Sequence, residues 1–506
     1  MIRVRFAPSP TGYLHIGSLR TALYNFLFAK KNKGKFILRI EDTDIKRKVK
    51  GATESLMKTL KEFGLNWDEG PFLRKVKNNF IIEQKGKYKP YIQSQRLQIY
   101  RKLAHELIKR DYAYYCFCTP KDLEKMRQEQ IAKKLPPMYD ERCRKLSKNE
   151  VKEKLKNKIP YVIRLKVPEE GKIKFYDLIR GEIEFDFKNI DDQILLKSDG
   201  YPTYHLAVVI DDHLMKVTHI IRGEEWLPSV PKHLLIYQAF GWQPPEFAHL
   251  PLILNPDRSK LSKRKSDVSV ESYLNQGYLP EAILNFIALL GWNPGTDQEI
   301  FSLKELINVF SLEKIQKAGA IFNREKLDWM NGYYIRKMKV NELAKKCISY
   351  LIKEGLIEKI SNLKFRILKT KEVVNLSWLK KIISLEQERM KKLSDLPELA
   401  NFFFEKKLKF DPKILIWKKM NLVQVKDNLK LIKENLLKIP ENKFKIKEIQ
   451  KILEKLAKEK GTGEIFWPFR VAISGKTASP PPAEIAEILG KEKTLIRIDE
   501  AVKLCQ

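Results

Sequence analysis

The feature that most constrains the fold is a strand, a turn-rich loop, a helix and a second strand within the first 44 residues. The strands are expected at 2–6 and 35–40, and the loop at 8–12. The helix expected at 16–31 carries its apolar side chains on one stripe, formed by Ile16, Leu19, Leu23, Phe26 and Leu27. Strands joined by such a helix run parallel. The chain is therefore predicted to have α/β architecture around a parallel sheet.

The start of this helix is the candidate phosphate site. The unit contains neither a Gly-x-Gly-x-x-Gly string nor a P-loop, so a nucleotide would have to bind through a different phosphate-binding element. The first turn of a helix offers unpaired N–H groups and the positive end of a dipole, which attract phosphate. His15 lies where the loop enters the helix and can donate a hydrogen bond to a phosphoryl oxygen, while Gly17 leaves room for a flat base. The alternative is a helix-capping loop with an incidental histidine.

A second short string forms a dense cationic loop, with the sequence Lys260-Leu261-Ser262-Lys263-Arg264. Cations held in place near developing phosphate charge make a large contribution to catalysis. The whole chain is basic, with a net charge of +34, so the alternative is a solvated lysine-rich turn.

The charge also limits the kind of partner. An excess of this size favours a polyanion, with nucleic acid first and an anionic membrane second, although a lysine-rich genome would give the same composition. No run reaches about 18 apolar residues, so no membrane span is expected. The strand-like start gives no sign of a signal peptide. Five cysteines in a long chain argue against a disulfide framework, and the expected compartment is the cytoplasm.

In this order, the two strings resemble the HIGH and KMSKS signatures of class I aminoacyl-tRNA synthetases. Their flanks, FAPSPTGYLHIGSLRTAL and PDRSKLSKRKSDVSV, narrow the resemblance to the bacterial-type glutamyl-tRNA synthetases. The resemblance spans nearly the whole chain and is strongest over residues 5–336. It implies ATP-dependent activation of L-glutamate to glutamyl-adenylate, then transfer to the 3′ end of tRNA(Glu), with release of AMP and pyrophosphate. It also implies Mg²⁺ with ATP, tRNA bound before glutamate is activated, and a monomer.

The resemblance also assigns site residues. It implies ATP contacts by Thr11, His15, Gly17 and Lys263, and catalytic roles for His15, Lys260 and Lys263. The glutamate contacts that it implies are Arg5, Ser9, Glu41, Tyr204 and Arg222. Glutamate has two carboxylates and one ammonium, which suit arginines and an acid respectively; Glu41 should hold the ammonium and Tyr204 should donate its hydroxyl. The chain departs from the family at two positions, because Ser18 replaces the second motif histidine and Val208 replaces an asparagine that faces the substrate.

A cysteine cluster predicts a metal site. Cys116 and Cys118 form a Cys-x-Cys pair, Cys143 follows downstream, and no histidine lies between residues 111 and 150. Three thiolates can bind tetrahedral zinc, to which ordinary sites add a fourth cysteine or histidine. The pattern resembles the zinc module in the acceptor-stem-binding insertion of glutamyl enzymes, in which a tyrosine can be the fourth ligand; here that residue is Tyr139. Structural zinc is expected, and the alternative is three reduced structural cysteines.

The pattern and the resemblance together predict five segments. These are the first half of a Rossmann-like catalytic domain at 1–95, a mixed zinc-bearing insertion that binds the acceptor stem at 96–202, the second catalytic half at 203–255, a stem-contact domain with the cationic loop at 256–336, and an anticodon-binding region at 337–506. From about residue 337 onward the pattern is helical and rich in lysine. This last region is therefore expected to be all-α.

Two other functions stay open at this stage. Glutaminyl-tRNA synthetases perform the same chemistry with glutamine, but they carry β-barrels where this chain has helical periodicity. A basic, non-catalytic RNA-binding protein with a degenerate synthetase core would have no need of the complete set of motif and glutamate-contacting residues. The sequence does not decide whether tRNA(Gln) is charged as well as tRNA(Glu).

Overall fold

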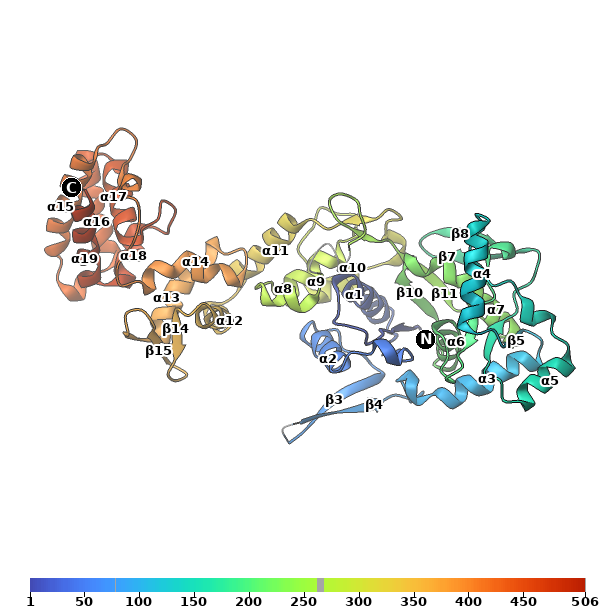
Figure 1. Cartoon of the computed structure of the whole chain (residues 1–506). Helices are drawn as coiled ribbons and strands as arrows, with labels where there is room; N and C mark the ends of the chain where they lie inside the picture. Colours follow the sequence, from blue (N-terminus) through green and yellow to red (C-terminus); the bar gives the residue numbers. More distant parts are fainter. Residues whose placement is uncertain (78, 262–267, 506) are drawn as a thin grey trace. The chain divides into compact units, whose positions relative to one another are not determined.

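The computed structural model describes residues 1–77, 79–261 and 268–505. The chain forms two compact units (Figure 1). The first unit comprises residues 1–274 and 280–324, and the second comprises residues 275–279 and 325–506. The segments that carry both sequence motifs belong to the first unit.

A parallel sheet forms the centre of the first unit, as the sequence predicts. β1 (Arg3–Phe6) and β2 (Lys35–Leu38) pair in parallel, and α1 (Ile16–Lys31) connects them and buries the predicted apolar stripe. β10 (His219–Gly223) lies beside β1, where the N–H of Thr218 donates to the carbonyl of Arg3 over 2.9 Å. β11 (Glu246–Leu250) pairs in parallel with β10. The carboxyl ends of these strands share one edge of the sheet.

Helices pack around this sheet and fix α1. The helices of this part of the unit are α6 (Tyr204–Leu214), α7 (Val230–Phe240), α8 (Val270–Asn275), α9 (Pro280–Ala288) and α10 (Leu303–Val309). The short strands β12 (Ile253–Leu254) and β13 (Ala320–Ile321) pair in parallel beyond them. Tyr24 of α1 donates its hydroxyl to the carbonyl of Ala288 over 3.0 Å, and Asn25 donates to the carbonyl of Ile221 over 3.0 Å. These long-range bonds hold the middle of α1 against α9 and β10.

The segment expected as an insertion contains two kinds of strand. After α3 (Leu97–Lys109), the strands β5 (Ala113–Cys116), β6 (Val162–Leu165) and β9 (Ile194–Leu196) form an antiparallel sheet, flanked by α4 (Pro120–Ala132) and α5 (Lys148–Lys156). The hairpin of β7 (Lys172–Asp177) and β8 (Gly181–Asp186) instead joins the central sheet, where Asp177 pairs with Phe247 of β11. Asp177 therefore reaches the catalytic core from within the inserted segment.

A second hairpin leaves the core beside α2 (Ala52–Glu62). Its strands are β3 (Gly70–Val76) and β4 (Asn79–Lys85), and Figure 1 shows them extending away from the rest of the first unit. Glu69, just before β3, bridges to Ile37 of β2, so the hairpin starts from the central sheet.

The second unit is mainly helical. Its helices are α11 (Arg324–Lys337), α12 (Val340–Lys353), α13 (Leu376–Glu386), α14 (Leu396–Ala400), α15 (Leu422–Leu437), α16 (Ile446–Lys460), α17 (Thr462–Ser474), α18 (Pro482–Leu489) and α19 (Lys491–Leu504). The expectation of an all-α region is wrong in one place. The strands β14 (Ile357–Lys359), β15 (Lys364–Ile367) and β16 (Val373–Asn375) form a small antiparallel sheet. Strands of three or four residues are too short to interrupt a helical periodicity visibly. Among the described residues of both units, no helix is long and apolar enough to span a membrane.

Candidate active site

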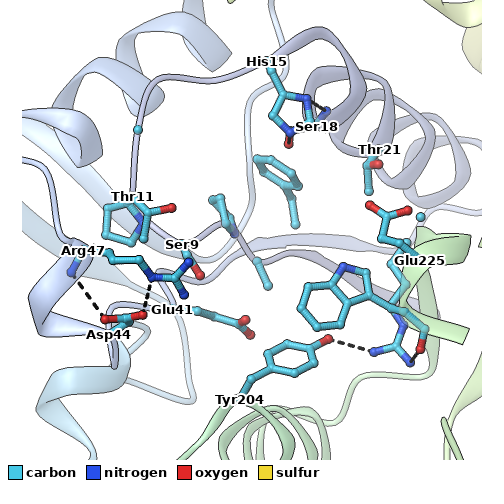
Figure 2. A pocket seen from close by; sticks show the side chains of 18 of the residues that line it. Ser9, Thr11, His15, Ser18, Thr21, Glu41, Asp44, Arg47, Tyr204 and Glu225 are labelled. Atoms are coloured by element: carbon cyan, nitrogen blue, oxygen red, sulfur yellow. Dashed lines mark hydrogen bonds and ion pairs between the residues drawn. The ribbon is translucent and has the colours of Figure 1, made fainter. Parts of the chain in front are cut away.

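A cavity of about 1120 Å³ opens at the carboxyl edge of the parallel sheet, the edge where open α/β sheets bind ligands. Figure 2 shows side chains around it from the loop that follows β1, from the first half of α1, from the residues after β2 and from the start of α6. The described residues to which the family resemblance assigns ATP binding, glutamate binding or catalysis all line it: Arg5, Ser9, Thr11, His15, Gly17, Glu41, Tyr204, Arg222 and Lys260. Lys263 lies outside the described residues. Segments more than 200 residues apart in the sequence therefore meet at one site.

Arg222, at the end of β10, is buried, and its guanidinium contacts neutral groups. Its Nη1 donates to the hydroxyl oxygen of Tyr204 over 2.8 Å, and its Nε donates to Nε2 of His249 over 3.0 Å. Nη2 reaches the carbonyl of Trp226 at 3.4 Å, and the Trp226 ring packs on Tyr204 with 4.3 Å between centroids. Within the described part of the chain, no carboxylate forms a salt bridge with Arg222. Its positive charge is therefore available to a ligand in the cavity.

Asp177 sets the orientation of His249, and thereby that of Arg222. One carboxylate oxygen of Asp177 lies 2.6 Å from Nδ1 of His249, and the other accepts the N–H groups of Ile179 and Arg180 over 3.0 and 2.9 Å. Because Nε2 accepts from Arg222, the neutral imidazole must carry its proton on Nδ1 and donate it to Asp177. Burial lowers the pKa of His249, and the hydrogen bond to Asp177 only partly opposes this effect. The neutral form that Arg222 needs is therefore favoured.

Arg5 and Glu41 line the cavity and belong to a largely buried ionic network. Asp212 accepts from Nε of Arg5 over 3.0 Å and from Nη1 of Arg39 over 2.6 Å, while Nη2 of Arg39 donates to Glu41 over 2.8 Å. Burial alone would raise the pKa of Asp212, but Arg39 and Arg5 hold it below its usual value. Burial raises the pKa of Glu41 despite Arg39, so a second cation beside this carboxylate would stabilise its ionised form. The network thus holds Arg5 at the cavity and leaves Glu41 able to accept an ammonium.

Asp211 connects this network to the start of α3. It accepts from Nε of Arg96 over 2.7 Å, from the hydroxyl of Tyr100 over 2.8 Å and from the side chain of Gln93 over 2.9 Å. Gln93 also lines the cavity. This network was not predicted from the sequence. The available signal was the pair Asp211-Asp212 within an otherwise apolar helix, because two consecutive buried acids require cationic partners.

His15 caps the start of α1 and is held by Ser18. The N–H of Ser18 donates to Nδ1 of His15 over 3.2 Å, and the Ser18 hydroxyl lies 2.9 Å from Nε2 (Figure 2). A neutral His15 therefore carries its proton on Nε2. A Cβ atom at Gly17 would lie 3.1 Å from Cε1 of the His15 ring, so glycine leaves the room that this ring occupies. The serine that replaces the second motif histidine thus orients the first.

Val208, at the position where the resemblance implies an asparagine that faces the substrate, lies in α6. It is 1% exposed, packs in the apolar core of the first unit, and is not one of the described residues that line the cavity. The valine side chain therefore packs in the apolar core.

The comparisons with known proteins agree with this site. Residues 1–329 match the family of class I tRNA synthetases (E and Q), catalytic domain, and residues 342–502 match an anticodon binding domain. The glutamate–tRNA ligase of Dehalococcoides mccartyi is 46% identical over 99% of this chain and 98% of its own length. The chain belongs to the class I glutamate–tRNA ligase family. The corresponding enzyme of Clostridioides difficile is 44% identical over 98% of both chains.

Solved structures of this family have the same fold. A glutamate tRNA ligase from Elizabethkingia meningosepticum, crystallised in complex with its amino acid, covers the whole chain with a TM-score of 0.84 and 38% identity. The enzyme from Elizabethkingia anophelis covers 99% of both chains with a TM-score of 0.85 and 39% identity. The family predicted from the two motifs is confirmed, and the chain is an aminoacyl-tRNA synthetase, a ligase.

The structure brings the cysteine cluster of this ligase together. The sulfur atoms of Cys116, Cys118 and Cys143 lie within 4.8 Å of one another. The hydroxyl of Tyr139 lies 3.4 Å from the sulfur of Cys116 and 3.5 Å from that of Cys118, and it accepts the N–H of Cys143 over 3.1 Å. A hydrogen bond from Cys143 holds the pKa of the Cys116 thiol well below its usual range. The donor set and its spacing fit a tetrahedral zinc ion.

Proposed function

We propose that this enzyme activates L-glutamate with ATP and joins it to tRNA(Glu), releasing AMP and pyrophosphate. The observation that carries the choice of amino acid is the neutral surroundings of Arg222. A buried guanidinium without a charged partner is costly, and the carboxylate of a glutamate side chain would compensate it, whereas the amide of glutamine would not. Arg5 differs, because Asp212 already balances its charge.

In the first step, a carboxylate oxygen of glutamate attacks the α-phosphorus of ATP, and the bond to pyrophosphate breaks. The proposal assigns the substrate ammonium to Glu41, one carboxylate to Arg5 with Ser9, and the other to Arg222 with the hydroxyl of Tyr204. Burial raises the pKa of Tyr204, so its phenol stays protonated and can donate while its oxygen accepts from Arg222.

ATP is assigned to the start of α1. The unpaired N–H groups of the first turn favour phosphate, and Thr11, His15 and Gly17 line the cavity there. Lys260 and Lys263 would stabilise the negative charge that develops on the leaving pyrophosphate. The Mg²⁺ that accompanies ATP supplies further positive charge at the phosphates.

In the second step, a hydroxyl of the 3′-terminal ribose attacks the carbonyl of glutamyl-adenylate, and AMP leaves. The lysine-rich second unit is proposed to read the anticodon of tRNA(Glu), in line with the family that residues 342–502 match. The proposal places the enzyme in the cytoplasm, as a monomer that binds tRNA before it activates glutamate. The experiment that tests the choice of amino acid also tests whether tRNA(Gln) is a second substrate.

A structural zinc ion is proposed for Cys116, Cys118, Cys143 and Tyr139. Three thiolates and one phenolate oxygen would complete a tetrahedral shell and leave no open position for catalysis. The ion would tie β5 to the loop that follows α4, on the part of the first unit assigned to the acceptor stem.

The test is aminoacylation with purified tRNA(Glu) and tRNA(Gln), each with glutamate and with glutamine. Glutamate should be attached to tRNA(Glu), and pyrophosphate exchange should depend on both glutamate and tRNA. Attachment of glutamine would identify the glutaminyl alternative, and absence of any charging by folded protein would identify a non-catalytic core.

A further inference from the structure

The hairpin of β3 and β4 exposes apolar and basic side chains together in its outer half. Val76, Phe80, Ile81 and Ile82 are 38, 50, 40 and 36% exposed. In the antiparallel register, Lys75 lies opposite Phe80 and Arg74 lies opposite Ile81, so each face of the ribbon mixes a cation with an apolar group. An isolated two-stranded ribbon has little stability of its own in water. Apolar side chains on both of its faces indicate a surface that a partner covers.

The base of the hairpin is firmly anchored. Glu69 accepts two hydrogen bonds from Arg3 over 2.7 and 3.0 Å, and Trp67 donates its ring N–H to the carbonyl of Pro71 over 2.8 Å. On the returning strand, Gln84 donates to Gln95 over 2.7 Å. The exposed outer half therefore extends from a fixed base.

The charge of the hairpin favours RNA as the partner. Residues 70–89 contain six basic side chains and one acidic side chain, Glu83, which Arg74 already pairs at 2.7 Å. Lys58 of the neighbouring α2 adds a further cation, 5.0 Å from the centre of the Phe80 ring. Lysines along ribbon edges discourage another protein strand from pairing there, and a chain of net charge +34 repels its own copies. Cations interleaved with an exposed aromatic ring are instead typical of surfaces that contact phosphates and stack on bases.

The position of the hairpin fits the same partner. The chain leaving β4 reaches Gln93, which lines the active-site cavity, within ten residues. A tRNA whose 3′ end enters this cavity must cross the neighbouring surface of the first unit. We infer that the outer half of the β3–β4 hairpin is a tRNA-binding arm of the catalytic unit, with Lys75 and Lys77 on phosphates and Phe80 against a base or ribose. This inference rests on the proposed function.

The test compares two double variants of the full-length enzyme. Lys75→Gln with Lys77→Gln removes two cations from the arm. Lys33→Gln with Lys216→Gln removes two exposed cations that precede β2 and β10, at the amino ends of the strands and away from the cavity. The dissociation constant for tRNA(Glu) is measured between about 50 and 300 mM salt. All four lysines are exposed, so both variants should keep the thermal midpoint of the wild-type enzyme.

The arm variant should bind tRNA(Glu) about tenfold more weakly at about 100 mM salt, with a log–log salt slope that is less steep by about two. The control variant should match the wild type in both. Phe80→Ala should weaken binding about tenfold with an unchanged salt slope, because stacking releases no counterions. Charging at saturating tRNA should proceed normally in all variants, since none of these residues lines the cavity.

Equal affinities and salt slopes in the arm and control variants would overturn the inference. Charging of tRNA(Glu) by the wild-type enzyme would still support the proposed function in that case. The inference would also be overturned if the wild-type enzyme forms dimers at higher protein concentration and Phe80→Ala does not, while the affinity for tRNA is the same in both. That result would show that a second copy of the chain covers the hairpin. Failure of the wild-type enzyme to charge tRNA(Glu) would instead reject the proposed function.

Discussion

Arg5 and Arg222 both line the cavity, and their neighbours leave them with different capacity to bind an anion. Nε and Nη2 of Arg5 both donate hydrogen bonds to the carboxylate of Asp212. The positive charge of Arg5 is therefore already balanced before a ligand binds. Arg222 contacts the neutral oxygens of Tyr204 and Trp226 and the neutral nitrogen of His249. We therefore expect an anionic side chain to gain more from Arg222 than from Arg5, and we expect the residues that keep His249 neutral to affect specificity for glutamate.

Asp177→Asn should raise the KM for glutamate about 10- to 100-fold, with a smaller effect on kcat. The carbonyl oxygen of the new amide would accept the N–H groups of Ile179 and Arg180, which now bond one carboxylate oxygen. Its NH₂ group would then face Nδ1 of His249 and shift the imidazole proton to Nε2, opposite the N–H of Arg222. Aminoacylation at varied glutamate concentration measures the effect.

His249→Gln provides the control for this variant. A glutamine side chain can offer its amide oxygen to Arg222 without help from residue 177, so Asp177→Asn should add little in that background. An Asp177→Asn effect that is equally large in both backgrounds would mean that Asp177 acts through the fold of β7 and not through His249.

The pH dependence of glutamate binding follows from the same imidazole. Burial lowers the pKa of His249 below its usual value, and the charged groups around it are Asp177 on β7, Arg222 on β10 and Arg180, which donates to its carbonyl. The neutral form accepts from Arg222, so the KM for glutamate should be flat above about pH 6.5 and rise as the pH falls through the lowered pKa. In His249→Gln the KM should stay flat over this range. A KM that rises equally in both enzymes would assign the titration to another group.

At the scale of single elements, the local sequence pattern was sufficient to predict the β1–α1–β2 unit but not to predict where β7 pairs in the sheet. The helix at 16–31 is specified by its own apolar stripe, so the sequence places its ends correctly. β7 lies in a strand-rich stretch, but its pairing with β11 joins residues 70 positions apart, and no local signal encodes such a pairing. For this reason Asp177 could not be assigned to the active site from the sequence.

The zinc module is a separate prediction at this scale. The purified enzyme should contain stoichiometric zinc, and Cys143→Ser should lose most of it, because a three-ligand remnant binds zinc far more weakly. Tyr139→Phe should keep the metal with about 10- to 100-fold lower affinity. Cys505→Ser, which changes a buried cysteine far along the chain, is the matched control and should keep full zinc. If elemental analysis finds no zinc in the purified, folded enzyme, the zinc site is wrong.

At the scale of the whole molecule, the sequence predicted residues that the structure, where it describes them, brings together at one cavity, but not what holds them there. The motif residues could be assigned because each lies in a recognisable string. The supporting ions Arg39, Asp211 and Asp212 could not, because their role depends on burial and on partners up to 207 residues away. Short strands such as β14 to β16 were missed for the related reason that three or four residues are too few to show a period of alternating side chains.

The division of labour between the two units gives the last prediction. Phosphate contacts supply affinity that falls with salt, whereas base contacts supply identity. α16 buries Ile449, Leu453 and Leu456 and exposes lysines on its other side. Single changes in the anticodon of tRNA(Glu) should therefore lower kcat/KM for charging by roughly 10- to 100-fold.

Neutralising two exposed lysines of α16, with Lys451→Gln and Lys455→Gln, should act differently from a change of base. It should weaken binding of every tRNA by the same factor and make the salt slope less steep by about two, while the preference among anticodons stays constant. Charging assays with wild-type and variant enzyme on the same set of tRNAs separate the two effects. If the wild-type enzyme ignores anticodon changes, the second unit does not read them, and its lysines serve only as a nonspecific anchor.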